Sequence, residues 1–164
     1  MDSPVGELRI VASSSGLVAV LWEREMENRV RFSGPIEKLS EPRGITAMAV
    51  SQLQEYFDAK RQSFDLPLDL RGTTFQIKAW RSLATIAFGR TASYREQAVL
   101  VGSPAAVRAV GSANGRNPVS IVLPCHRVIG SNGSLTGFAG GLDAKRSLLE
   151  FELRVSMGAT EPMK

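Results

Sequence analysis

The first part of the chain alternates hydrophobic and polar positions with the period of a β-strand. Residues 4–12 and 17–23 alternate or run apolar, and the turn 13–16, Ser-Ser-Ser-Gly, lies between them. Two such segments joined by a short polar turn predict a β-hairpin. Residues 24–44 are charged, contain two prolines and have no sustained period. We therefore expect mostly loop there, with room for one short strand at residues 30–32.

A helical period follows this loop. Within residues 45–59 the apolar side chains recur at approximately helical spacing, which predicts a helix. Residues 63–70 are expected to form a further strand. This first part of the chain shows no grouping of residues suited to catalysis, so we interpret it as a small α+β scaffold with a supporting role.

Two further helices are predicted at the start and the end of the second half. Thr73 and Gln76 have the spacing of a capping box, and an apolar stripe follows them. We expect this helix to end near residues 88–89, where a glycine supplies the stop. Residues 142–152 are predicted to form a closing helix with a packed apolar side, and residues 156–164 a frayed tail.

The stretch between these helices has the pattern of a helix-turn-helix. Ser93 and Glu96 again have capping-box spacing and predict a short helix over residues 94–101. Gly-Ser-Pro at residues 102–104 then restarts the chain, with the serine as N-cap and the proline at the first helical position. A second helix is predicted over residues 105–113. Two short helices joined by a tight turn fit the motif, although many helix pairs share this pattern.

The second helix of this pair is unusually slender. Small residues such as Ala106 and Gly111 dominate it, and Arg108 is its single long polar side chain. A helix that reads bases in the major groove normally carries several Arg, Asn or Gln residues. A thin helix with one arginine suits close approach to a narrower groove, and the arginine could fill the space left by a displaced base. Tight packing of small residues against a neighbouring helix is an equally good interpretation.

These elements predict the α+β fold class. We expect a small N-terminal α/β lobe at residues 1–71. Residues 72–164 should form a mainly helical C-terminal domain that carries a helix-turn-helix of the winged-helix-like type.

Composition and charge narrow the functional classes. Of the 164 residues, 43% are hydrophobic, which is enough for a packed core, and no segment has the apolar length of a membrane span. No secretory signal is visible near the start of the sequence. Residues 1–71 contain 9 basic and 11 acidic side chains, whereas residues 72–164 contain 11 basic and 5 acidic ones. This asymmetry favours a polyanionic partner such as nucleic acid over a merely basic surface.

The only cysteine and the only histidine of the chain are adjacent, at Cys125 and His126. One cysteine excludes an intramolecular disulfide and fits a reducing cytoplasm, and one Cys with one His cannot form a Cys/His zinc site. Pro124 stiffens the backbone before the thiol. Because sequence neighbours do not face each other, we expect the two side chains to communicate through a water, with another residue orienting the imidazole. The alternative is an inert buried cysteine beside a surface histidine.

Pro-Cys-His-Arg-Val at residues 124–128 is preceded by Asn-Pro at 117–118 and followed by Gly-Phe-Ala-Gly-Gly at 137–141. This series of motifs closely resembles the O6-alkylguanine-DNA alkyltransferases, also called methylated-DNA–protein-cysteine methyltransferases, of the bacterial and archaeal type. The resemblance covers residues 72–152, about half of the chain, with several motifs in order at matching separations. The N-terminal part fits the family only in outline.

The resemblance implies a chemistry that agrees with the residues. An alkylated guanine would be flipped out of the duplex, and Cys125 would take the alkyl group irreversibly, so that each molecule acts once. His126 would activate the thiol through water, and Glu152 would orient the imidazole. Asn117 would hold the active-site turn by hydrogen bonds. Tyr94 would protonate the departing guanine.

The resemblance also implies contacts with DNA and with the base. Arg108 would fill the gap in the base stack, on a helix that the family places in the minor groove with Ala106 and Gly111. The backbone carbonyls of Cys125 and Val128 would accept from the exocyclic amine, and the loop at residues 138–139 would wall the pocket. Phe138 and Ala139 stand where some members have Tyr and Ser, so their hydroxyls are missing, whereas the backbone roles are kept.

Two rival classes are less consistent with the sequence. A lesion-sensing relative has another residue in place of the cysteine, and a plain helix-turn-helix regulator leaves the Cys-His pair unexplained. A cysteine hydrolase leaves the basic stretch unexplained, and its signature motifs are not present. We therefore expect a cytoplasmic monomer that binds duplex DNA containing O6-alkylguanine and needs no metal or cofactor. Activity on O4-alkylthymine and cooperative binding to DNA are hypotheses that the sequence does not test.

Overall fold

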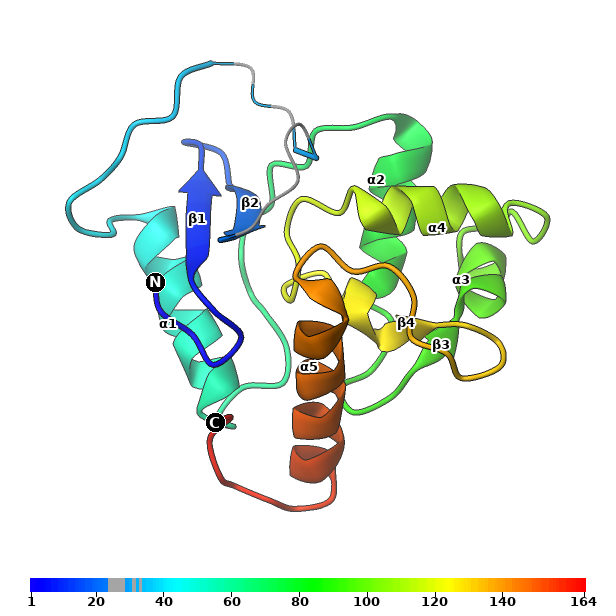
Figure 1. The fold of residues 1–164 in the computed structure, drawn as a ribbon. Helices are drawn as coiled ribbons and strands as arrows, with labels where there is room; N and C mark the ends of the chain where they lie inside the picture. The colour runs from blue at the N-terminus through cyan, green and yellow to red at the C-terminus, as the bar shows by residue number, and fades with distance from the viewer. Residues whose placement is uncertain (24–28, 31, 33) are drawn as a thin grey trace.

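A hairpin and a long helix form the N-terminal part of the computed structural model, which describes residues 1–23, 29–30, 32 and 34–164. The hairpin pairs β1 (Leu8–Ala12) with β2 (Leu17–Trp22) in antiparallel fashion, as predicted. It is followed by α1 (Ile45–Phe57), which lies alongside β1 (Figure 1). The strand expected at residues 30–32 includes Arg31, which lies outside the described residues.

The strand predicted at residues 63–70 is wrong. Leu68 forms only an isolated bridge to Leu17, whose backbone N–H and C=O pair with Pro67 and Asp69 at 2.7 and 2.9 Å. Because Pro67 has no N–H, this segment cannot extend a regular ladder of hydrogen bonds.

The C-terminal part contains four helices and a small parallel sheet. Its elements are α2 (Thr74–Leu83), β3 (Ala92–Ser93), α3 (Tyr94–Leu100), α4 (Val107–Gly115), the 3₁₀ turn η1 (Cys125–Arg127), β4 (Val128–Ile129) and α5 (Gly141–Ser156). Both predicted capping boxes are present, at the start of α2 and at the start of α3. The fold class is therefore the predicted α+β arrangement, with α3 and α4 as the paired helices (Figure 1).

Three predicted boundaries in this part need correction. Helix α2 ends at Leu83 and not near residues 88–89, because the next amides donate to carbonyls three residues back and tighten the chain into turns. Helix α4 begins at Val107, because residues 103–106 form a turn closed by the Ala106 amide and the Ser103 carbonyl at 2.8 Å. It also ends later than expected, since buried Asn114 exchanges hydrogen bonds with Gln97.

The closing helix is longer than expected, and the tail after it is packed where a frayed end was expected. Helix α5 continues to Ser156. The tail after it is not frayed throughout, because Met163 is buried and its amide donates to the Phe57 carbonyl at 2.7 Å. The chain therefore returns to the C-terminal end of α1, close to which the C-terminus lies (Figure 1).

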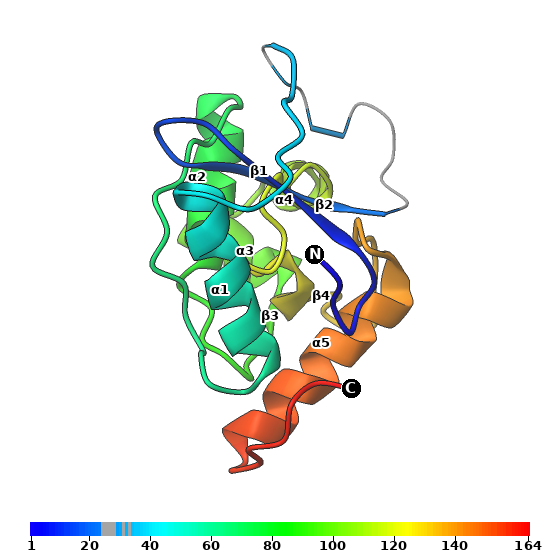
Figure 2. The ribbon, with the colours of Figure 1, turned by 90° about the vertical axis from the view of Figure 1, so that its left-hand side faces the viewer.

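The main hydrophobic core runs between the two halves. Strand β2 is buried along its whole length, and its residue Val20 forms a parallel bridge to Val119, in the segment that leads to Cys125. Figure 2 shows α1 and α5 on opposite sides of this region. A second, smaller core lies between α2, α3 and α4. The segment of residues 117–129, the candidate active-site segment, is thus supported by the N-terminal hairpin as well as by the helices of the C-terminal part.

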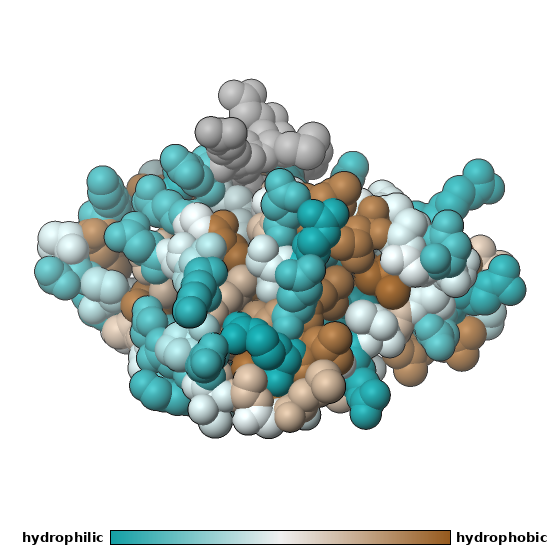
Figure 3. Space-filling model, turned by 60° about the horizontal axis from the view of Figure 1, so that its bottom comes forward, coloured by the Kyte–Doolittle hydropathy of each residue, from teal (hydrophilic) through white to brown (hydrophobic). Residues whose placement is uncertain are grey.

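On the face seen in Figure 3, hydrophobic residues occur in small groups between hydrophilic ones. Among the described residues, no helix is long and apolar enough to cross a membrane.

Candidate active site around Cys125

The segment before Cys125 is a loop closed on itself by buried hydrogen bonds. The Asn117 side chain donates to the Leu123 carbonyl at 2.7 Å and accepts from the Val119 amide at 3.2 Å. Ile121 has a φ of 73°, which is an outlier for a β-branched residue and costs on the order of 1–3 kcal/mol. The surrounding contacts therefore hold this loop in a strained shape.

Cys125 is buried, with 5% of its surface exposed. Burial raises the pKa of its thiol, and the Asn117 side chain and the positive charges of Lys145 and Arg29 offset this only in part. The thiol is therefore neutral at rest. It needs a proton acceptor to become a nucleophile.

His126 and Glu152 form a fully buried pair, with His126 Nε2 and Glu152 Oε1 2.8 Å apart. Burial tends to raise the pKa of Glu152, but hydrogen bonds and charge from His126 and Arg127 outweigh it and lower the pKa to about 2. The carboxylate is thus ionised and can only accept, so Nε2 carries the imidazole proton. The other ring nitrogen, Nδ1, then has a free lone pair, and it is buried without a hydrogen-bond partner among the described residues.

Burial also lowers the pKa of His126. The imidazole is therefore neutral, its orientation is fixed by a carboxylate, and its available lone pair lies in the residue next to the thiol. These are the properties of a general base. The structure does bring Cys125, His126 and Glu152 together, and it excludes the surface-histidine alternative because His126 has no exposed surface.

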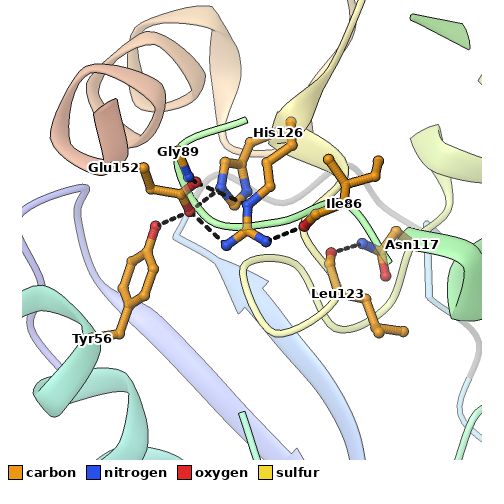
Figure 4. Close-up of polar contacts among 8 residues, drawn as sticks. Tyr56, Ile86, Gly89, Asn117, Leu123, His126 and Glu152 are labelled. Carbon is orange, nitrogen blue, oxygen red and sulfur yellow. Dashed lines mark hydrogen bonds and ion pairs between the residues drawn. The ribbon is translucent and has the colours of Figure 1, made fainter. Parts of the chain in front are cut away.

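Glu152 accepts from three further groups that sequence reasoning missed (Figure 4). Arg127 donates through Nε and Nη2 to both carboxylate oxygens, at 2.8 and 2.9 Å, and through Nη1 to the Ile86 carbonyl at 2.6 Å. The Tyr56 hydroxyl donates to Oε1 at 2.8 Å, and the Gly89 amide to Oε2 at 3.1 Å. Because α2 ends at Leu83, the turns after it bring the Ile86 carbonyl and the Gly89 amide to this network. No local sequence signal marks Tyr56, which lies in an apolar stripe.

Lys145 is a further residue that sequence reasoning missed. Its buried ammonium donates to the carbonyls of Val128 at 2.6 Å and Thr136 at 2.9 Å, and burial lowers its pKa. Thr136 in turn donates from its hydroxyl to the Tyr94 hydroxyl at 3.2 Å. Lys145 therefore holds together the end of the active-site segment and the loop that faces Tyr94.

Tyr94 and Val128 are neighbours because β3 and β4 pair. Ala92 lies opposite Val128, and Ser93 lies opposite Ile129. Ser93 is also the N-cap of α3, whose first residue is Tyr94. The pairing thus fixes the half-buried Tyr94 ring beside the active-site segment.

The residues predicted to contact DNA lie on or next to α4, close to Tyr94. Arg108 is exposed, Ala106 is the N-cap of the helix, and Gly111 lies against the Tyr94 ring, where an added Cβ would be 3.7 Å from it. Because such a Cβ would make only an ordinary van der Waals contact, packing against Tyr94 does not require a glycine at this position. The exposed Arg108 stays available for a partner.

Phe138 and Ala139 are half-buried in the loop before α5. The Phe138 ring makes edge contacts with Trp22, at a centroid distance of 5.3 Å, and with His126, at 6.2 Å. A cleft of about 390 Å³ lies between this loop and the N-terminal hairpin, and a second cleft of about 280 Å³ lies behind the active-site loop, along residues 122–124. Cys125 is not among the described residues that line these two clefts.

Comparison with known proteins agrees with this arrangement. The family model described as "6-O-methylguanine DNA methyltransferase, DNA binding domain" matches residues 74–154. The model described as "6-O-methylguanine DNA methyltransferase, ribonuclease-like domain" matches residues 1–70. Paired helices, a strained cysteine loop and an imidazole–carboxylate pair therefore occur in a chain whose two parts match one DNA methyltransferase family.

Individual methylated-DNA–protein-cysteine methyltransferases match nearly the whole chain. The methylated-DNA–protein-cysteine methyltransferase of Mycobacterium tuberculosis is 45% identical over 93% of this chain and 89% of its own. The protein of the same name from Methanosarcina barkeri is 43% identical over 93% and 94%. A crystal structure of OGT from M. tuberculosis in complex with DNA has a TM-score of 0.79, at 41% identity over 94% and 91% of the two chains. The chain belongs to the 6-O-methylguanine DNA methyltransferase family and to its enzyme class, the methylated-DNA–protein-cysteine methyltransferases.

Proposed function

We propose that this protein repairs duplex DNA by moving an alkyl group, typically methyl, from O6 of a flipped-out guanine to Sγ of Cys125. One observation carries the proposal. The residue after the thiol is a buried neutral imidazole whose Nε2 donates to Glu152, which leaves Nδ1 free to accept a proton. This state is the one that a base needs in order to convert a buried thiol into a thiolate.

The proposed step balances as follows. His126 Nδ1 takes the thiol proton through one water, and the sulfur attacks the alkyl carbon as the bond from carbon to O6 breaks. Tyr94 supplies a proton to the departing guanine, and the imidazolium proton returns to Tyr94 through solvent. In the net reaction the thiol loses one proton, guanine gains one and Tyr94 is restored, while the alkyl group ends on sulfur. Because the thioether bond formed at Cys125 is not broken again, one protein molecule repairs one lesion.

The proposed contacts with the base use the residues around Tyr94. The Val128 carbonyl already accepts from Lys145, but a carbonyl has two lone pairs and can also accept from the exocyclic amine of guanine. The Cys125 carbonyl would be the second acceptor. The loop of Phe138 and Ala139 would wall the pocket and supply a backbone amide near O6.

DNA is proposed as the partner on two grounds. The related OGT of M. tuberculosis has been crystallised with DNA, and residues 72–139 of this chain contain seven basic side chains against one acidic. Arg108, exposed on α4, would enter the minor groove with Ala106 and Gly111 close to the backbone. The proposal also divides the chain at residue 72 into a supporting unit and a DNA-binding unit.

We propose in addition that the protein is a monomer and that it acts in the cytoplasm, where Cys125 stays reduced.

Transfer of labelled methyl groups tests the proposal. Duplex DNA with radiolabelled methyl on guanine O6 should give one label per protein in a single burst, located on Cys125. A Cys125→Ala variant should bind the duplex and take no label. Arg108→Ala should keep the reaction with free O6-benzylguanine but react more slowly with the duplex. Equal labelling of Cys125→Ala would overturn the assignment.

A further inference from the structure

The strongest unassigned feature is the contact of the N-terminal half with the catalytic carboxylate. Tyr56 lies on α1, 96 residues before Glu152, and its hydroxyl donates to Glu152 Oε1 at 2.8 Å. Neither side chain has exposed surface. A buried hydroxyl that reaches a buried carboxylate across the core is a specific contact, not incidental packing.

The oxygen that Tyr56 contacts is the one that His126 uses. Oε1 accepts from the Tyr56 hydroxyl at 2.8 Å, from His126 Nε2 at 2.8 Å and from Arg127 Nη2 at 2.9 Å, whereas Oε2 accepts from Arg127 and Gly89 (Figure 4). Each donor to an anion reduces the negative charge available to the others. Tyr56 and His126 therefore compete for the same lone pairs.

We propose that Tyr56 is a positioning residue for alkyl transfer, whose hydroxyl limits how strongly Glu152 holds the proton of His126. The inference rests on the proposed role of His126 as the base. Without the hydroxyl, more of the charge on Oε1 would act on the imidazole and would stabilise its protonated form. A protonated His126 has no free lone pair and cannot accept the thiol proton.

The hydroxyl can play this role at every working pH. Burial, together with the charge and the hydrogen bond of Glu152, raises the pKa of Tyr56 well above its ordinary value, so it remains a neutral donor. Its ring is fixed by edge contacts with Phe57, Phe88 and Phe151, at centroid distances of 5.3, 6.0 and 5.5 Å. The donor is therefore held in place by rings from both halves of the protein.

The other charged or titratable groups that face His126 are unchanged when the hydroxyl is removed. Glu152 and Lys145 act on it from α5 and Arg127 from its own turn, Cys125 is the preceding residue, and Tyr56 on α1 reaches it only through Glu152. In a Tyr56→Phe variant the four other groups stay, and only the donor on Oε1 is lost. Any change in the titration of His126 then reports on that donor.

The chain offers a direct readout because it has a single histidine. A ¹⁵N NMR titration of histidine-labelled protein follows His126 alone, with no need for alkyl transfer. In Tyr56→Phe we expect the imidazole to protonate at higher pH than in the unchanged protein. The acid limb of the transfer rate should move in the same direction, so that the rate on that limb falls by a factor of about two to ten, the size of one hydrogen bond. The rate on the plateau should change less than about twofold.

Two further variants separate positioning from structure. Phe57→Leu removes packing beside Tyr56 but leaves the hydroxyl, so it should lower stability and leave the His126 titration unchanged. Tyr56→Met removes the hydroxyl with different packing and should reproduce the shift of Tyr56→Phe. An unmoved titration in both Tyr56 variants would overturn the proposal, even if their rates fall at all pH values. Absence of methyl transfer in the unchanged protein would instead refute the proposed function, and the NMR titration would still show whether the Tyr56 hydroxyl disfavours protonation of His126.

Discussion

Arg127 makes the most contacts with the Glu152 carboxylate, and its removal gives the sharpest test of the network. In an Arg127→Met variant, Glu152 loses two charged hydrogen bonds, to Nε at 2.8 Å and to Nη2 at 2.9 Å, and the Ile86 carbonyl loses its donor at 2.6 Å. Methionine keeps much of the apolar volume. The main change is therefore an uncompensated negative charge in the core.

Removing one partner of a buried ion pair costs about 3–5 kcal/mol. His126 remains in the variant and still stabilises the Glu152 carboxylate, which favours the lower end of this range. We expect Arg127→Met to lower the free energy of unfolding by about 3 kcal/mol at pH 7, which should lower the Tm by roughly 6–12 °C in a chain of this length.

The same variant should impair the base. The positive charge of Arg127 helps to keep the pKa of His126 low. Without that charge, Glu152 attracts a proton onto the imidazole, so the pKa of His126 rises and alkyl transfer at neutral pH slows. Chemical denaturation measures the first effect, and the ¹⁵N titration of the single histidine measures the second.

Arg146→Met is the matched control. Arg146 lies on α5 in an exposed pair with Asp143 at 3.3 Å, and such pairs contribute little. Its loss should change the free energy of unfolding by less than about 0.5 kcal/mol. Equal stability of the two variants, with an unmoved His126 titration in both, would refute the network as described.

Three further outcomes follow from individual contacts. Asn117→Ala removes the acceptor of the buried Val119 amide and one of the two donors to the Leu123 carbonyl, which keeps the Cys125 amide at 2.9 Å. It should therefore cost about 1–3 kcal/mol by chemical denaturation and slow transfer; full stability would contradict the tight loop. Gly140→Ala places a Cβ 2.7 Å from the Trp22 ring, so it should lower the free energy of unfolding by about 1–3 kcal/mol in the same assay. Gly115→Ala is the control and should be tolerated, because its Cβ meets nothing within 4 Å. Ionised Glu152 has a folded pKa of about 2, below its ordinary 4.5, so its contribution is complete above pH 4.5 and is lost as the pH falls toward 2; denaturation curves that coincide at pH 6 and pH 3 would contradict this.

The parts of the fold that could be predicted from sequence are those set by local chemistry. The capping boxes at Thr73 and Ser93 involve residues three positions apart, and both are present. The hairpin follows from an alternating pattern around a polar turn. Helix ends were less predictable, because the early end of α2 depends on turns that reach Arg127 and Glu152 far along the chain.

The candidate site divides in the same way. Cys125 and His126 were found because they are unique and adjacent, and the resemblance supplied Glu152. Tyr56 and Lys145 were missed, because a tyrosine in an apolar stripe predicts packing and a lysine in an amphipathic helix predicts an exposed side chain. Their polar roles depend on partners, Glu152 and the Val128 carbonyl, that only the folded chain brings to them.

The central claim is that Sγ of Cys125 accepts the alkyl group. Intact-protein mass spectrometry after reaction with duplex DNA containing O6-methylguanine, followed by peptide mapping, measures this directly. We expect one added methyl group per chain, on the peptide that contains Cys125, and a yield that never exceeds one repaired lesion per protein molecule. An unmodified Cys125 with repaired DNA, or repair of many lesions by one molecule, would contradict it.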